Sequence, residues 1–356
     1  EVHASNVAKR WAAAGLDVTL RTSFAVGRPP TEVRDGFRVV RRSGRYLVFP
    51  HAAITEALQR NGPWDAFVEI WNGMPFFSPL WTLRKPSTVW LHHMHAEMWH
   101  QTFEDKPLIG HAGKALETRI APLLYRRTRI VTLSTSSKHE LVHSMGFHDD
   151  RVDVVPPGID PRFSPGAVRS DVPLVVAVGR LVPVKQHDVL LRVLAKVRQK
   201  VPNLRAVIAS EGYRRPHLEQ LRHELGLDDV VSMPGWVSDD DIVDLYRSAW
   251  LLAATSSHEG WDMTVTEAAA CGTPAVVTDI AGHRDAVAAG RSGFLCTGED
   301  VLAARMVDVL TDDVLRRELG DGALAHASQF TWDNTALGTF RALHGEATSA
   351  RRRAGA

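Results

Sequence analysis

The sequence predicts an α/β protein built from two doubly wound domains, each a parallel sheet covered by helices. Short apolar segments of strand length alternate with helical patterns along the chain, which is typical of parallel sheets with buried strands. The 356 residues are enough for two domains with separate cores. A segment rich in proline and glycine, 156–166, interrupts the pattern near the middle and can continue neither a helix nor a central strand.

The expected strands are short and mostly apolar. They lie at 17–22, 66–70, 88–91, 130–133 and 152–155, and then at 174–178, 205–209, 230–233, 250–254 and 275–278. Helical patterns occupy 189–201, 216–225, 238–248 and 301–309. A last helix is expected from Phe330 to about His344. Two helix starts are suggested by capping residues: Ser137 with Glu140, and Ser238 followed by three aspartates.

The interruption at 156–166 sets the expected domain boundary. We place the first domain at 1–160, the second at 161–330, and a C-terminal helix that returns to the first domain, with its tail, at 331–356. Ligands of open α/β sheets bind beyond the carboxyl ends of the strands. A cleft between the two domains, lined by strand ends from both, is therefore the expected site.

Composition and charge limit the classes of function. The chain is 44% hydrophobic and 23% charged, as globular proteins are. No apolar run has the length of a membrane span, and no signal-peptide pattern opens the chain. Two cysteines are too few for a disulfide framework, which favours the cytoplasm.

The net charge of +1 conceals an uneven distribution. Residues 1–165 carry 21 Lys and Arg against 16 Asp and Glu, and the remainder carries 21 against 25. A basic first half favours an anionic acceptor or peripheral contact with the inner face of a membrane. Ordinary scatter of surface charge explains it equally well.

The segment 256–274 contains two carboxylates, Glu259 and Glu267, separated by seven residues. It leads from the strand at 250–254 into a helix expected to begin near Thr264. The free amides and partial positive charge of a helix N-terminus suit a phosphate. A carboxylate before the helix and one in its first turn can both face the hydroxyls of a nucleoside-diphosphate sugar. The alternative is that Thr264 and Glu267 form only a capping box.

Two cations follow the strand 174–178. Arg180 comes just after the strand end, and Lys185 is expected to open the next helix. A lysine at a helix start is unfavourable against the helix dipole, so an anionic ligand gives it a reason to be there. Either residue taken alone fits a solvated surface charge. The spaced pair after a strand favours binding of a diphosphate.

Taken together, the Glu-x7-Glu segment and the Gly-Arg-Leu-x-x-x-Lys segment at 179–185 resemble the donor site of family 4 retaining glycosyltransferases, which have the GT-B fold. The resemblance covers nearly the whole chain. It implies transfer of a hexose-type sugar from a UDP- or GDP-linked donor to an acceptor hydroxyl, with retention of anomeric configuration. Arg180 and Lys185 would neutralise the leaving diphosphate, Glu259 would contact the transferred sugar, and Glu267 would bind the ribose. Because two cations do this work, no metal or other cofactor is expected.

The resemblance also implies a set of donor contacts in the loops of the second domain: Gly179, Ser210, Val237, Gly260, Trp261, Asp262, Met263 and Thr264. Two of these depart from the family's pattern. Asp262 stands where a small residue is usual, and a carboxylate there repels a diphosphate unless its side chain turns outward. Ser210 lies in a loop usually richer in glycine, which leaves the choice between uracil and guanine open.

The first domain is expected to supply the acceptor side. Three histidines, His92, His93 and His95, follow the strand 88–91. Zinc needs three or four well-placed ligands, and no Cys or Asp cluster nearby completes such a set. The resemblance implies that His92, or as a rival His93, lines the reaction centre. Glu69, Trp71 and Asn72 are further candidate acceptor contacts, for an acceptor that is a glycan, a lipid-linked molecule or a natural product, and not a nucleic acid.

Other readings are limited by missing motifs. A dinucleotide-binding dehydrogenase needs Gly-x-Gly-x-x-Gly after a strand, which is absent from the sequence, and Gly113-Lys114 is followed by Ala115, unlike a P-loop. A GT-B epimerase or phosphorylase and a catalytically weak donor-binding homologue stay open as alternatives. The resemblance further implies a strand and a glycine-rich loop ahead of Glu1. With no obvious nucleophilic carboxylate in the first domain, a same-face displacement with the leaving phosphate as base is the expected mechanism.

Overall fold

A computed structural model describes residues 2–44, 47–60, 62–71, 74–82, 85–92, 107–166 and 169–354. The chain forms two compact units, with unit 1 comprising Glu1–Gly158 and Trp332–Ala356, and unit 2 comprising Ile159–Thr331. Within the described ranges, no helix combines the length and the apolar character that crossing a lipid bilayer requires.

Unit 2 contains a six-stranded sheet whose hydrogen-bonded pairs are all parallel. The strands, in spatial order, are β10 (Val231–Gly235), β9 (Arg205–Ala209), β8 (Leu174–Val178), β11 (Leu251–Ala254), β12 (Ala275–Thr278) and β13 (Gly293–Cys296). Chain order therefore runs outward from β8 in one direction and then resumes at β11 in the other. In a doubly wound sheet this reversal opens a crevice beyond the carboxyl ends of the two central strands. The loops after β8 and β11 are the ones it brings together.

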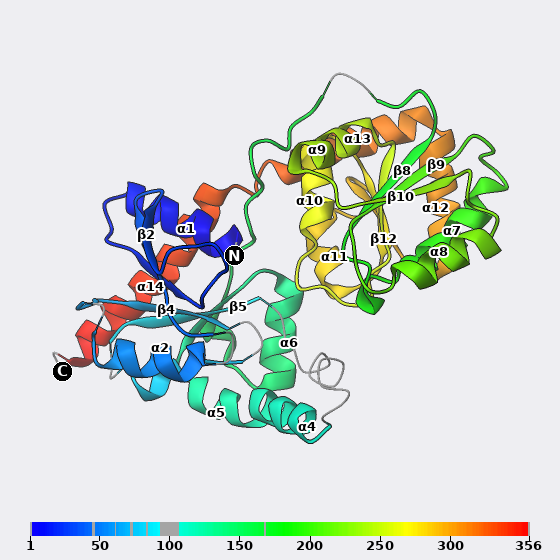
Figure 1. Cartoon of the computed structure of the whole chain (residues 1–356). Coiled ribbons are helices and arrows are strands. Elements are labelled where there is room, and N and C mark those ends of the chain that lie inside the picture. The colour runs from blue at the N-terminus through cyan, green and yellow to red at the C-terminus, as the bar shows by residue number, and fades with distance from the viewer. Residues whose placement is uncertain are drawn as a thin grey trace. The chain divides into compact units, whose positions relative to one another are not determined.

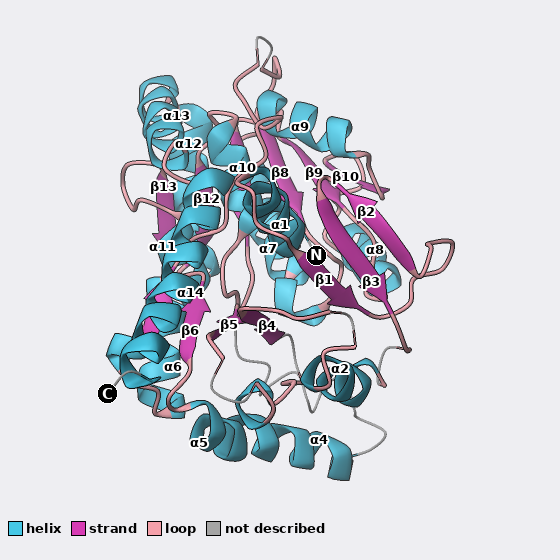
Figure 2. Ribbon diagram, turned by 90° about the vertical axis from the view of Figure 1, so that its left-hand side faces the viewer, coloured by secondary structure: helices cyan, strands magenta, loops and turns pink. Residues whose placement is uncertain are grey.

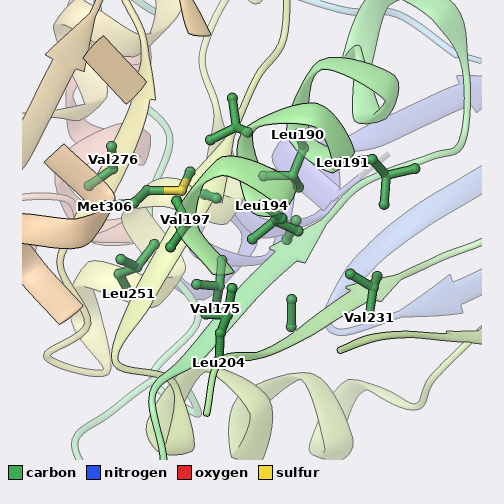
Figure 3. Packing of buried hydrophobic residues seen from close by; sticks show 14 of the residues in the cluster. Val175, Leu190, Leu191, Leu194, Val197, Leu204, Val231, Leu251, Val276 and Met306 are labelled. Carbon is green, nitrogen blue, oxygen red and sulfur yellow. The ribbon is translucent and has the colours of Figure 1, made fainter. Parts of the chain in front are cut away.

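Helices cover both faces of this sheet. Figure 1 shows α7 (His187–Arg198), α8 (Arg215–Glu224) and α12 (Glu299–Thr311) on one face, and α9 (Asp239–Ser248), α10 (Met263–Ala270), α11 (Ala281–Ala286) and α13 (Asp313–Ala327) on the other. In Figure 3, Leu190 and Leu194 of α7 pack over the strand residue Val175, and Met306 of α12 lies beside Val197 of the same helix α7. Each such buried aliphatic side chain contributes about 1.5–3 kcal/mol. This core fixes the positions of the strand ends.

The described residues of unit 1 form two sheets. Four parallel strands lie in chain order, β4 (Phe67–Trp71), β5 (Ser87–Leu91), β6 (Arg129–Thr132) and β7 (Val152–Val154). A smaller sheet has the order β1 (Thr19–Thr22), β3 (Phe37–Arg41) and β2 (Thr31–Arg34), in which β2 is antiparallel to β3 (Figure 2).

Helices complete unit 1: α1 (Val2–Ala13), α2 (Val48–Ala57), α4 (Pro107–Ala115), α5 (Ala121–Tyr125), α6 (Thr135–Met145) and α14 (Trp332–Ala354). A π-helical turn, η2 (Leu116–Ile120), joins α4 to α5, and short 3₁₀ turns lie at η1 (Ser78–Leu80) and η3 (Asp149–Arg151). The last helix, α14, packs beside α1 (Figure 1). Trp11 of α1 donates its indole N–H to the carbonyl oxygen of Ala336 at 2.9 Å.

The expected α/β architecture with parallel sheets is confirmed, and a strand lies at each of the ten expected places. Three strands were not expected, namely β2, β3 and β13. The capping prediction at Ser238 is confirmed, because its hydroxyl accepts from the Asp241 amide and the Asp241 carboxylate accepts from the Ser238 amide. The prediction that Ser137 opens a helix is wrong. The helix begins at Thr135, and the Ser134 side chain caps it by accepting from the Ser137 amide.

Candidate functional site

The loops after β8 and β11 are hydrogen-bonded to each other beyond the sheet. The Ser257 amide donates to the carbonyl oxygen of Val184 at 2.8 Å. The Thr255 hydroxyl donates to the carbonyl oxygen of Gln186 at 2.9 Å. Both bonds end on backbone carbonyl oxygens of the loop after β8. The two loops are therefore held together by the protein itself, without a ligand. They bring the two predicted motifs into one place.

Lys185 ends a 3₁₀ turn, η4 (Pro183–Lys185), and does not open the helix. Gln186 follows in the left-handed region with φ of 48°, and α7 begins at His187. The helix was expected to begin at Lys185, and it begins two residues later, at His187. The turn directs the Lys185 ammonium to the loop after β11, where Nζ lies 2.7 Å from Oε1 of Glu259.

Lys185 and Glu259 are each only 17% exposed, so this ion pair is largely shielded from water. Burial opposes the charge on Lys185, but the carboxylates of Asp262 and Glu259 outweigh it and raise the Lys185 pKa above its ordinary value. Lys185 is therefore a fixed cation at neutral pH. A fixed cation beside a helix N-terminus is suited to a diphosphate.

Asp262 turns inward, contrary to the outward orientation that tolerance of a diphosphate was expected to require. It is 2% exposed and is the N-cap of α10. Its Oδ1 accepts from the Thr264 amide at 3.0 Å and from the Thr264 hydroxyl at 2.7 Å. Its Oδ2 lies 3.2 Å from His283 Nε2 and 3.8 Å from Lys185 Nζ. Although burial opposes ionisation, Lys185 and His283 hold the pKa of Asp262 well below its ordinary value.

Glu267 lies in the second turn of α10, one turn later than expected. Because Asp262 caps the helix, Glu267 is not the partner of a Thr264 cap, and the capping-box alternative is wrong. Its Oε2 accepts from the Tyr246 hydroxyl at 3.3 Å. Burial, together with the negative charge of Asp262, raises the pKa of Glu267 to about 8. The carboxyl is therefore mostly protonated at neutral pH in this arrangement.

His283 was not singled out from the sequence, yet it is fully buried beside Asp262. It lies on α11, which follows the end of β12. The preceding residue, Gly282, allows the close approach, because a Cβ there would lie 2.4 Å from the carbonyl oxygen of Glu259. The sequence did contain a signal for His283, because it follows the strand β12. Since β12 neighbours β11, polar residues that follow these two strands lie at the same edge of the sheet.

The other predicted donor residues occupy varied positions. Arg180 is exposed, and a Cβ on Gly179 would lie 3.2 Å from Cε of Lys185. Trp261 is buried with its ring packed edge-on against Phe330 at 5.0 Å, so its side chain faces the core. Gly260 is buried, and Met263 and Thr264 are half-buried in the first turn of α10.

Ser210 and Val237 lie after β9 and β10. Ser210 has a φ of 148°, a conformation that favours glycine, so the backbone there is glycine-like although the residue is not. Val237 lines a cavity of about 660 Å³ beside α9, together with residues of β9, β10 and α9. Of the predicted donor residues, Val237 alone is among the described lining residues.

In unit 1, two of the predicted acceptor contacts lie in the core. Glu69 is 1% exposed and Trp71 is fully buried. Glu69 accepts from the amides of Phe76 and Ser78 and from the Tyr125 hydroxyl at 2.8 Å, and burial raises its pKa. The structure thus places both residues in internal packing and bonding, with neither surface open to an acceptor.

His92 follows β5 directly and is half-buried. Its Nε2 lies 2.8 Å from Nδ1 of His3, whose ring stacks on Trp90. Burial lowers the pKa of His3 to about 4, so His3 is neutral at physiological pH. One nitrogen of the pair must therefore donate to the other. The remaining predicted residues, Asn72, His93 and His95, fall outside the described residues.

Two family models match this chain, one in each half. The model described as Glycosyltransferase Family 4 matches residues 1–163, and the model described as glycosyl transferases group 1 matches residues 161–325. The second match contains the whole Lys185, Glu259 and Glu267 constellation. The chain belongs to glycosyltransferase family 4.

Curated members of related sequence carry a more specific name. The D-inositol 3-phosphate glycosyltransferase of Acidothermus cellulolyticus is 34% identical over 236 residues, covering 60% of this chain and 53% of the relative. The protein of that name from Salinispora arenicola is 35% identical over 249 residues, covering 62% of this chain and 55% of the relative. The chain thus spans about half the length of the curated relatives it matches.

Solved structures support the GT-B fold. Sucrose-phosphate synthase from Thermosynechococcus elongatus has a TM-score of 0.81 at 18% identity, covering 98% of this chain and 93% of that one. HepE from Anabaena, solved with UDP and glucose, has a TM-score of 0.75 at 19% identity, covering 97% and 95%. At these identities the likeness concerns the fold. In this family 4 chain, the constellation is built on the second of the two GT-B domains.

Proposed function

We propose that this chain is a retaining glycosyltransferase that transfers a hexose-type sugar from a UDP- or GDP-linked donor to an acceptor hydroxyl. The observation that carries the proposal is the meeting of Lys185 with Glu259 at the strand reversal, next to the N-terminus of α10. It combines a shielded cation, a carboxylate and helix amides within one small region. These are the groups that a diphosphate and a sugar require.

Each residue has a role in the proposed reaction. Lys185 and Arg180 stabilise the negative charge that develops on the leaving diphosphate, which is preorganised electrostatic catalysis. Glu259 accepts hydrogen bonds from hydroxyls of the transferred sugar. Glu267 accepts from the ribose hydroxyls once it is ionised. His92 belongs to the acceptor side of the reaction.

The proposed chemistry is a same-face displacement. The acceptor oxygen forms a bond to the anomeric carbon as the bond to the diphosphate oxygen breaks, and the leaving phosphate takes the acceptor's proton. No metal is needed for charge neutralisation, because the protein supplies two cations. Trapping a covalent glycosyl-enzyme with donor alone would contradict this step, as would a product of inverted configuration by NMR.

Donor binding is the first test. Thermal unfolding would be followed with UDP, GDP and ADP and their glucose, N-acetylglucosamine and mannose conjugates, with EDTA and again with Mg²⁺. A ligand that binds the native state alone raises the unfolding midpoint. We expect a shift with one nucleotide class, with and without metal. A panel in which no nucleotide raises the midpoint contradicts the proposal.

The acceptor is tested separately. The names of the curated relatives make D-inositol 3-phosphate the first acceptor to try, and the basic first half of the chain suits an anionic molecule. Product analysis with and without acceptor distinguishes transfer from the alternatives. An epimerase changes the donor sugar without acceptor, a phosphorylase requires inorganic phosphate, and a weak donor-binding homologue binds the nucleotide without turnover.

A further inference from the structure

The N-terminus of α10 already holds an anion that belongs to the protein. Asp262 is the N-cap, and its Oδ1 accepts hydrogen bonds from the Thr264 amide at 3.0 Å and from the Thr264 hydroxyl at 2.7 Å. This amide is one of those that the proposed function assigns to the diphosphate. A carboxylate at a helix N-terminus is stabilised by the same amides and dipole that would stabilise a phosphate. The two anions therefore compete for one environment.

Two contacts hold the neighbouring His283 against this carboxylate. Its Nδ1 lies 2.8 Å from the carbonyl oxygen of Thr278, which can only accept. Its Nε2 lies 3.2 Å from Oδ2 of Asp262. Both oxygens of the Asp262 carboxylate are thus held by contacts within unit 2.

The positive charge of Lys185 is shared between two carboxylates, those of Glu259 and Asp262. Nζ of Lys185 lies 2.7 Å from Oε1 of Glu259 and 3.8 Å from Oδ2 of Asp262, so its positive charge interacts with both carboxylates. A diphosphate that arrives here meets a cation that is already compensated.

We infer that Asp262 is a built-in counter-ion that weakens binding of the nucleoside diphosphate at the N-terminus of α10. The inference rests on the proposed function, because it concerns the same donor site. The effect of Asp262 on diphosphate binding comes from its charge, which acts on Lys185 and the helix amides. It does not come from a change in the conformation of the loop. Since the nucleoside diphosphate is also the released product, such a counter-ion limits product retention.

The test separates charge from shape. Asp262→Asn keeps the side-chain size, and Asn caps helices as well as Asp does. Asp262→Ser supplies a second neutral cap. A matched control is Asp312→Asn, because Asp312 caps α13 in the same unit and accepts from the amides of Val314 and Leu315 at 2.9 and 3.0 Å. All three substitutions remove one negative charge from a helix N-terminus, but the control is not part of the donor constellation.

Affinities for UDP, GDP, uridine and guanosine would be measured by titration calorimetry, with unliganded unfolding midpoints as a check of folding. We expect Asp262→Asn and Asp262→Ser to bind the preferred diphosphate on the order of tenfold to a hundredfold more tightly, with affinity for the nucleoside unchanged. Asp312→Asn should match the parent chain.

Unchanged or weaker diphosphate binding in both folded Asp262 variants, with the parent chain binding normally, overturns the inference alone. An equal gain in Asp312→Asn overturns it too, because the effect would then be one of general charge. If the parent chain and all variants bind none of the nucleotides, the proposed function fails and the inference with it.

Discussion

Nζ of Lys185 lies 2.7 Å from Oε1 of Glu259, across the point where the strand order of unit 2 reverses. The cation proposed to face the diphosphate and the carboxylate proposed to face the sugar are thus partners of each other. A bound diphosphate would compete with Glu259 for the ammonium. Glu259 would then be released to accept hydrogen bonds from the sugar hydroxyls. A single exchange of partners would thus leave the Lys185 ammonium bound to the diphosphate and the Glu259 carboxylate free to bind the sugar.

Lys185→Ala should abolish most nucleotide binding. Loss of a shielded cation beside the phosphate weakens binding of UDP or GDP by about 10- to 100-fold, measured by the ligand-induced rise in unfolding midpoint. The variant should also be about 1–3 kcal/mol less stable without ligand, because the carboxylates of Glu259 and Asp262 lose their partner.

The control for this experiment is Lys196→Ala in the same unit. Lys196 is 42% exposed and pairs with Glu299 and Asp300 on α12. Surface pairs of this kind contribute little to stability, and nucleotide binding should not change. Equal losses of binding in the two lysine variants would argue against a specific role for Lys185.

The raised pKa of Glu267 predicts that nucleotide affinity depends on pH. Its pKa of about 8 keeps it protonated at pH 7, whereas ribose hydroxyls are best accepted by the ionised form. Binding should therefore release a proton, and affinity should rise from pH 7 toward pH 9 and level off above the pKa. Glu267→Gln should remove this rise, measured by calorimetry in buffers of different ionisation enthalpy. A pH profile that persists unchanged in the variant would assign it to another group.

The same pKa predicts how unfolding free energy responds to pH. A carboxyl whose folded pKa is raised binds its proton more tightly in the folded state. The stability it contributes is full below its unfolded pKa, and is lost as pH rises toward about 8. Glu267→Gln should therefore gain stability over the parent chain across that window. Denaturant unfolding at pH 5 and pH 8 would measure the difference.

The strands were predictable because a buried parallel strand is apolar at successive positions. Leu174–Val178 and Ala275–Thr278 are of this kind, and both are strands in the structure. The strands β2 and β3 were missed because Thr31–Arg34 and Phe37–Arg41 contain charged residues. No residue of β2 is buried, and in β3 the charged Arg41 is itself buried. A run of apolar residues therefore identifies a strand only when the strand is buried and its buried positions are apolar.

The meeting of Lys185 with Glu259 was predictable for a different reason. Lys185, Glu259 and Glu267 stand at fixed spacings after strands, and the parallel-sheet rule brings those strand ends together. The inward turn of Asp262 and its pairing with His283 were not predictable, because they depend on side-chain packing across α11. The burial of Glu69 and Trp71 was not predictable either, because it depends on packing within unit 1, where the Tyr125 hydroxyl donates to Glu69.

Gly282→Ala should disturb the Glu259 loop. A Cβ at this position would lie 2.4 Å from the Glu259 carbonyl oxygen and 2.8 Å from its Cβ, so the backbone must move. We expect a loss of about 1–3 kcal/mol in stability and a clear fall in nucleotide affinity. Gly345→Ala is the control, because nothing lies within 4 Å of the added Cβ and Ala favours a helix by about 0.5–1 kcal/mol. Retained affinity in Gly282→Ala would mean that the loop tolerates the shift.

Ser210→Gly should stabilise the protein, which is unusual for a substitution to glycine. Ser210 has a φ of 148°, and strain of this kind costs about 1–3 kcal/mol in a residue with a side chain. The conformation is imposed by the following turn, since a Cβ on Gly212 would lie 2.3 Å from the Leu181 carbonyl oxygen, leaving the loop no room to relax.

Glycine also gains freedom in the unfolded chain, which offsets about 0.4–1 kcal/mol. The net expectation is a gain of about 1 kcal/mol, or roughly 2–4 °C in unfolding midpoint. Ser232→Gly, an exposed position within β10 without a left-handed φ, should instead lose about 0.5–1 kcal/mol. If both variants lose stability equally, the loop after β9 is not strained, and its conformation must be as accessible to serine as to glycine.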